Sequence, residues 1–207
     1  MVTTLLKSTL REIRQSLGRF MAILAIVALG VGFLSGLRMS QPSMAATGVT
    51  YLREHNFHDY RLVSTLGFTE QDVDFFAQAP GMELARGSVS APFLWQKTPT
   101  EQAVLTALTL TEGINTPNLL AGRMPTAPNE CLGDAHLFAQ GDIGSTLTVS
   151  AQNDQDTLDL LVYEEYKLVG IADSPLYLNG ERGTAGIGNG TVAGFVLVPP
   201  RGFDTEA

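Results

Sequence analysis

The sequence has little cysteine and few basic residues, and both shortages exclude classes of protein. Among 207 residues Cys131 is the one cysteine, which rules out an internal disulfide framework and any zinc module built on several cysteines. Thirteen basic residues face 21 acidic ones, giving a net charge of −8. Because nucleic-acid binders display a basic surface, this balance excludes nucleic acid as an expected partner. The fold must rest on packing, for which 44% apolar residues is enough.

Motifs for catalysis or cofactor binding are also missing. No serine stands in a GxSxG elbow, and the glycine-rich stretch 180–194 lacks the GK[ST] ending of a P-loop. His55 and His58 are three residues apart in an expected strand, so their rings would point to opposite faces. His136 stands alone in the sequence. We therefore predict no catalytic residues, no cofactor, no metal and no enzyme activity, and we interpret 180–194 either as a loop with turn glycines or as a partner-binding loop.

One apolar run is long enough to cross a bilayer. Residues 20–37 are 18 uncharged residues and span about 27 Å as a helix, close to the hydrocarbon thickness of about 30 Å. Four basic residues and one acidic give residues 1–37 a charge of +3, whereas nine basic and 20 acidic give residues 38–207 a charge of −11. Since flanking basic residues favour the cytoplasm, we predict a protein of the cell membrane. Its transmembrane helix would cover 17–39, with the N-terminus inside and 40–207 extracytoplasmic.

Two patterns around this run predict contacts with partners. Residues 1–16 have an apolar and a basic helical face, as in a cytoplasmic amphipathic helix on the lipid bilayer. The basic face consists of Lys7, Arg11 and Arg14. Within the span, small residues recur on one seam at spacings of three and four, and they end in a GxxxG pair. The seam consists of Gly18, Ala22, Ala25, Gly32 and Gly36, interrupted by Leu29. It predicts packing against other transmembrane helices.

Beyond the span the pattern predicts one α+β domain with mostly antiparallel strands. Alternating or β-branched apolar runs predict strands at 57–65, 88–96, 103–110, 146–151, 158–171 and 191–198. Thr69 and Asp72 are spaced as in a capping box and predict a short helix, which Pro80-Gly81 ends. Residues 130–138 predict a second short helix. Helical segments are too few for regular βαβ crossovers.

The order of these parts resembles the MacB/FtsX-type permeases of ABC transporters. The helix LLKSTLREIRQSLGRF, the span ending GVGFLSGL and the following YRLVSTLGFTEQDVDFFAQAPGM each resemble segments of that family. The run NLLAGRMPTAPNEC resembles the family's Gly-Arg-x-Pro followed by Asn-Glu, with Gly122, Arg123, Pro125, Asn129 and Glu130 at those positions. GDIGSTLTV, YKLVGIADSPLYLN and ERGTAGIGNGTVAGFVLVP are similar to its closing half, so the resemblance covers nearly the whole chain.

The resemblance implies a permease subunit that hydrolyses no ATP itself and works with a separate ABC ATPase. It places the basic N-terminal face near that ATPase or the inner leaflet, and it gives the Gly-Arg-x-Pro and Asn-Glu residues a structural role in a turn. Whether Arg123 and Glu130 meet stays open at this level. Family permeases have at least four spans, so the chain is expected to be the N-terminal part of a longer permease. Its substrate stays unidentified.

Two alternatives remain open. A stand-alone, membrane-anchored binding or sensor domain would have the same span and the same extracytoplasmic part. Ser43-Met44-Ala45 resembles a signal-peptidase site, and cleavage there would release a secreted enzyme that begins at Ala46. The apolar run exceeds the roughly 7–15 residues of a signal peptide, and an organised helix precedes it. Both features favour a permanent anchor.

Overall fold

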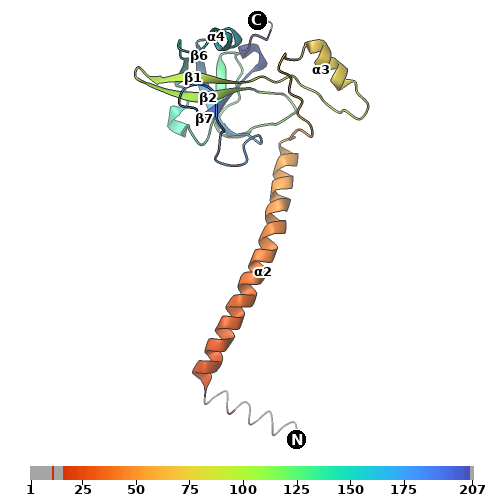
Figure 1. The fold of residues 1–207 in the computed structure, drawn as a ribbon, viewed down its shortest axis with the longest axis vertical. Coiled ribbons are helices and arrows are strands. Elements are labelled where there is room, and N and C mark those ends of the chain that lie inside the picture. Colours follow the sequence, from red (N-terminus) through yellow and green to blue (C-terminus); the bar gives the residue numbers. More distant parts are fainter. Residues whose placement is uncertain (1–10, 12–15, 206–207) are drawn as a thin grey trace. The chain divides into compact units, whose positions relative to one another are not determined.

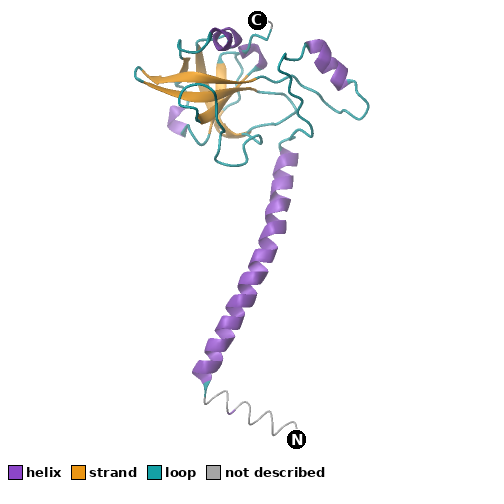
Figure 2. Cartoon of the chain, viewed as in Figure 1, coloured by secondary structure: helices purple, strands orange, loops and turns teal. Residues whose placement is uncertain are grey.

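The computed structural model describes residue 11 and residues 16–205, which belong to two units, Met1–Thr50 and Tyr51–Ala207. The first unit consists of most of one long helix, and the second contains a β-sheet with short helices (Figures 1 and 2). Lys7 and Arg14, with most of the predicted amphipathic helix, lie outside the described residues. Arg11 is helical and exposed.

The long helix, α2, runs from Leu17 to Glu54 and has no buried residue. Its 38 residues would span about 57 Å at the usual rise per residue, so it exceeds the thickness of a hydrocarbon core. Among the described residues it is the one helix that is long and apolar enough to cross a membrane. The helix continues through Pro42, beyond residue 39 where the predicted span ends. The apolar run therefore occupies only the N-terminal part of a longer rod.

In the described part of the chain, seven strands form a single sheet in the order β3-β6-β4-β7-β2-β1-β5. Their bounds are β1 Ser90–Thr98, β2 Glu101–Thr109, β3 Asn118–Gly122, β4 Glu130–Asp134, β5 Thr146–Val149, β6 Glu165–Asp173 and β7 Val192–Val198. Because β5 also pairs with β6, six strands close into a ring, and β3 extends the same edge of β6 that β5 occupies. Only β2–β7 and β4–β6 are parallel. The predicted α+β class with mostly antiparallel pairing is confirmed.

Apolar side chains are buried on both faces of this sheet. One face holds the larger cluster, in which the rings of Trp95 and Phe138 lie 5.5 Å apart and Leu105 and Leu168 are fully buried. The other face holds a smaller cluster around Phe195, which is also fully buried. A strand that is covered on both faces does not alternate between apolar and polar residues, so its sequence does not show the pattern by which half-buried strands are predicted.

Within the described ranges, four short helical segments lie outside the strands. They are α3 Glu70–Ala77, α4 Gln155–Leu160 and the 3-10 turns η1 Gln140–Asp142 and η2 Pro200–Gly202. Helix α3 begins as predicted, because the Thr69 hydroxyl accepts a hydrogen bond from the Asp72 amide and the Asp72 carboxylate accepts one from the Thr69 amide. This reciprocal cap satisfies amides that the first helical turn would otherwise leave unpaired.

Several sequence-based predictions of secondary structure are wrong. Residues 130–138 begin with strand β4 where a helix was expected, because the segment is enclosed between β6 and β7. The expected strand 158–171 is divided into the end of α4 and strand β6. Residues 57–65 form no strand pairing among the described residues. Strand β3 was missed, because its five residues alternate too briefly to give a signal.

Candidate functional site

The Gly-Arg-x-Pro segment forms the connection between β3 and β4, and glycine is required at its first position. Gly122, the last residue of β3, has a φ of +82°. A Cβ at this position would lie 2.3 Å from the carbonyl oxygen of Val169 on β6. The next residue uses that same carbonyl, because the amide of Arg123 donates to it at 3.0 Å. The chain therefore turns away from β3 while in direct contact with β6.

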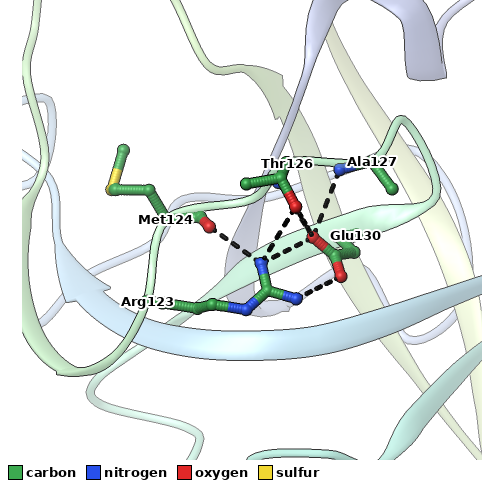
Figure 3. Close-up of polar contacts among 5 residues, drawn as sticks. All are labelled: Arg123, Met124, Thr126, Ala127 and Glu130. Atoms are coloured by element: carbon green, nitrogen blue, oxygen red, sulfur yellow. Dashed lines mark hydrogen bonds and ion pairs between the residues drawn. The ribbon is translucent and has the colours of Figure 1, made fainter.

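Arg123 and Glu130 meet across this connection (Figure 3). The guanidinium donates from Nη1 to Glu130 Oε2 at 2.8 Å and from Nη2 to Oε1, which makes the pair bidentate. The amides of Thr126 and Ala127 also donate to Oε2, at 2.8 and 3.2 Å. Nη1 further donates to the carbonyl oxygen of Met124 at 3.0 Å. Each end of the turn is thus tied to its middle by charge-assisted hydrogen bonds.

This geometry fixes the ionisation of the pair. The Arg123 guanidinium, followed by the Thr126 amide, holds the pKa of Glu130 far below its usual range. The Glu130 carboxylate in turn raises the pKa of Arg123. A carboxylate that stays ionised and has both oxygens occupied is a poor proton donor and has little capacity left for a metal ion. The pair therefore stabilises the turn, as the family resemblance implies.

The contribution of Glu130 to stability is expected to disappear in acid. Its pKa is lower in the folded protein than its unfolded value of about 4.3, so the contribution is complete above that pH and is lost as the pH falls toward the folded pKa. The unfolding midpoint of the wild type should exceed that of Glu130→Gln at neutral pH, and the gap should narrow steadily as the pH falls below about 4. Fluorescence of Trp95, the one tryptophan, reports both midpoints. A gap that acid leaves unchanged would contradict this assignment.

The two remaining motif residues act through the backbone. The carbonyl oxygen of Asn129 accepts a hydrogen bond from the Lys167 amide of β6 at 2.8 Å. Pro125 is half-buried in the middle of the turn, where a fixed φ reduces the freedom of the unfolded chain. The five motif residues are therefore gathered in one turn on the edge of β6, although only Arg123 and Glu130 interact through their side chains.

A second polar cluster, which the sequence did not reveal, lies on the smaller core. The guanidinium of Arg182 donates to both carboxylate oxygens of Asp134, at 2.9 Å from Nη2 to Oδ1 and also from Nε to Oδ2. The Asp134 side chain is fully buried and that of Arg182 is 4% exposed. Arg182 also lies over the stacked rings of Tyr177 and Phe195. Because a guanidinium can only donate, His136 Nδ1, which lies 2.9 Å from Nη2, is the acceptor of that contact.

This cluster links the glycine-rich stretch 180–194 to the sheet. Gly183, Gly188 and Gly190 have positive φ, as turn glycines do, and a partner-binding role of the loop stays a prediction. Between them and the sheet, Arg182 fastens the loop to the end of β4 through Asp134. The sequence contains little that could have revealed this ion pair. Asp134 lies at the end of a strand and Arg182 follows 48 residues later, so no local spacing connects them.

The other groups that suggested chemistry have structural partners. His55 Nδ1 lies 2.9 Å from the Thr116 carbonyl oxygen, and His58 Nδ1 lies 2.9 Å from Asn115 Oδ1. Burial raises the pKa of the Cys131 thiol to about 12, which makes it a poor nucleophile at neutral pH. Among the described residues no group of three or more His, Cys, Asp or Glu side chains is placed to hold a metal ion.

The small-residue seam is exposed along α2. Its members, Gly18, Ala22, Ala25, Gly32 and Gly36, all lie in helical backbone with exposed surfaces. A Cβ added at Gly32 or Gly36 would meet nothing within 4 Å. A shallow apolar groove runs along this surface between Ala25 and Phe33. The seam predicts that another helix packs closely here, and no side chain of α2 at Gly32 or Gly36 would block it.

Comparison with known proteins gives one structural likeness. No family model matches the sequence, and no curated protein matches it. The extracellular domain of the noncanonic ABC-type transporter YknZ from Gram-positive bacteria is similar in structure, with 11% sequence identity and a TM-score of 0.42. The similar region covers 66% of this chain and 64% of that domain.

Proposed function

We propose that this chain is a permease subunit of an ABC transporter of the MacB/FtsX type, or the N-terminal part of one. The observation behind the proposal is that an apolar helix of membrane-spanning length is followed in the chain by an α+β domain with the family's Gly-Arg-x-Pro and Asn-Glu residues. The ion-paired turn made by Arg123 and Glu130 supports it, because a structural role for those residues is what the resemblance implies.

In this proposal α2 is a permanent anchor in the cell membrane. The charge of +3 on residues 1–37 and of −11 on residues 38–207 favours a cytoplasmic N-terminus and an extracytoplasmic sheet domain. The seam that includes Gly32 and Gly36 would pack against further transmembrane helices of the permease. A separate ATPase would bind and hydrolyse ATP at the cytoplasmic face, and its movement would reach the outer domain through the membrane helices.

Affinity purification of the tagged full-length protein from native membranes tests this proposal. In mild detergent, mass spectrometry should find an ATPase with a Walker motif in the purified complex. Replacing Lys7, Arg11 and Arg14 together with glutamate should reduce its recovery several-fold, because attraction between charged surfaces would become repulsion. A matched control makes the same change of charge at three exposed residues of the outer domain, Arg86, Lys97 and Arg201.

The control should keep the ATPase, and both variants should retain native Trp95 fluorescence. If the wild type and the N-terminal variant recovered the same amount of ATPase, the basic face would not be part of the contact with the ATPase. Absence of any ATPase from the wild-type complex would overturn the permease assignment and favour a stand-alone sensor domain.

A further inference from the structure

An exposed apolar segment, residues 59–66, follows α2 in the chain. The side chains of Tyr60, Leu62, Val63 and Leu66 are 83%, 59%, 77% and 97% exposed. Among the described residues, no backbone-to-backbone hydrogen bond connects 59–65 to any other segment. An extended segment with free amides, free carbonyls and large apolar side chains is a template for adding another strand.

The backbone of this segment has two hydrogen-bonding edges, and one of them faces its own domain. The amide of His58 donates to Asn115 Oδ1 at 3.2 Å, so the backbone of residue 58 faces its own domain. The backbone groups of successive residues in a strand point to opposite edges. Once the bend at Asp59 straightens, the amides and carbonyls of Asp59, Arg61 and Val63 therefore face away from the domain.

The charges on this free edge are complementary to themselves. Neither Asp59 nor Arg61 forms an ion pair among the described residues. When two copies of the segment pair antiparallel with Tyr60 opposite Tyr60, each Asp59 lies opposite the other copy's Arg61. The nearest registers that keep the same backbone edge facing the partner are shifted by two residues, and they place Asp59 opposite Asp59 or Arg61 opposite Arg61. Like charges directly opposite are unfavourable. Charge therefore selects one register.

We propose that residues 59–63 pair with the same segment of a second copy of this chain, as an antiparallel two-stranded ribbon centred on Tyr60. Asp59 and Arg61 exchange two backbone hydrogen bonds with each other across the ribbon, and Tyr60 occupies the narrow pair between them. The contact is two-fold symmetric, so it closes as a dimer rather than growing into a fibre. It covers apolar side chains that a single copy leaves in water.

Single-cysteine cross-linking of the full chain in membranes tests the ribbon and its register. A narrow pair has Cα atoms about 4.5 Å apart, within the range for a disulfide, so Tyr60→Cys should give a reducible dimer under mild oxidation. Leu62→Cys should not, because the two Leu62 residues would be about 13 Å apart along the ribbon. The parent protein is the blank, since Cys131 is fully buried.

Charge reversal then separates this contact from any other use of the segment. In the Tyr60→Cys background, Asp59→Arg or Arg61→Asp alone should reduce the dimer about fivefold or more, because two favourable pairs become two like-charge pairs. The double reversal restores complementarity and should restore the dimer. All these side chains are exposed, and native Trp95 fluorescence verifies the fold of each variant.

Three outcomes would overturn the proposal. Tyr60→Cys and Leu62→Cys would cross-link equally if the copies met only by collision. The double reversal would fail to restore the dimer if the two charges did not face each other. A cross-linked product whose mass is that of this chain plus a different protein would show that another polypeptide supplies the strand.

Discussion

Gly122→Ala should destabilise the sheet domain by about 3 kcal/mol or more, a large part of the roughly 5–15 kcal/mol by which a typical domain is stable. Two costs add at this position. A φ of +82° is strained for any residue with a Cβ. That Cβ would also lie 2.3 Å from the Val169 carbonyl oxygen and 2.7 Å from the Gly170 Cα, both of which are backbone atoms of β6 that cannot rotate away.

Two glycines of the same domain provide matched controls. Gly144 has a φ of +99°, but a Cβ added there would meet nothing within 4 Å, so Gly144→Ala should cost about 1 kcal/mol. Gly141 has neither feature, and Gly141→Ala should change stability by less than about 0.5 kcal/mol. Denaturant titration followed by Trp95 fluorescence measures all three. Equal costs for Gly122→Ala and Gly144→Ala would mean that β6 gives way easily.

The thiol of Cys131 gives a second, local measurement. It is fully buried on β4, one residue after the ion-paired turn, and its raised pKa keeps it protonated. In the native protein it should react slowly with an aromatic disulfide reagent. In Gly122→Ala the reaction should be faster in proportion to the population of the opened state.

The parts of the fold that were predicted correctly are those with a local signal. The long helix α2 was recognisable because it contains 18 consecutive uncharged residues. The Thr69 cap needs only two residues three positions apart. Strands β1, β2 and β7 were found because β-branched and large apolar residues are concentrated in them, although their bounds shifted by up to a few residues.

The errors arise where long-range pairing decides the structure. Residues 130–134, ECLGD, lack the alternation of apolar and polar residues that reveals a strand, because β4 is buried on both faces. The segment 57–65 has the alternation of a strand but pairs with no strand among the described residues. Periodicity reports which faces a segment could bury, whereas a strand also needs a partner edge.

The same distinction applies to the polar clusters. Arg123 and Glu130 are seven residues apart, so a turn between them is enough to bring them together, and the family resemblance drew attention to both. Asp134 and Arg182 meet only because β4 and the glycine-rich loop are packed on one sheet face. No sequence rule assigns a partner to a buried carboxylate before the fold is known.

Arg182→Met should destabilise the domain by about 3–5 kcal/mol, the usual cost of removing one member of a buried ion pair. Methionine replaces most of the apolar volume over Tyr177 and Phe195, so the loss is chiefly electrostatic. The fully buried Asp134 carboxylate would keep the His136 amide, 2.9 Å away, as a hydrogen-bond donor but would lose the bidentate guanidinium. The loop should also detach, which hydrogen exchange at the amides of 183–192 measures.

An exposed pair and a double variant separate charge burial from mere loss of an arginine. Lys97 and Glu101 form an ion pair with side chains 47% and 55% exposed, so Lys97→Met should cost less than about 0.5 kcal/mol. Adding Asp134→Asn to Arg182→Met removes the uncompensated charge while keeping an oxygen for the His136 amide, and part of the lost stability should return. If the double variant were less stable than Arg182→Met, the carboxylate would be stabilised by something other than Arg182. Recovery would show that the loop depends on neutralising Asp134, because the two variants differ chiefly in that charge.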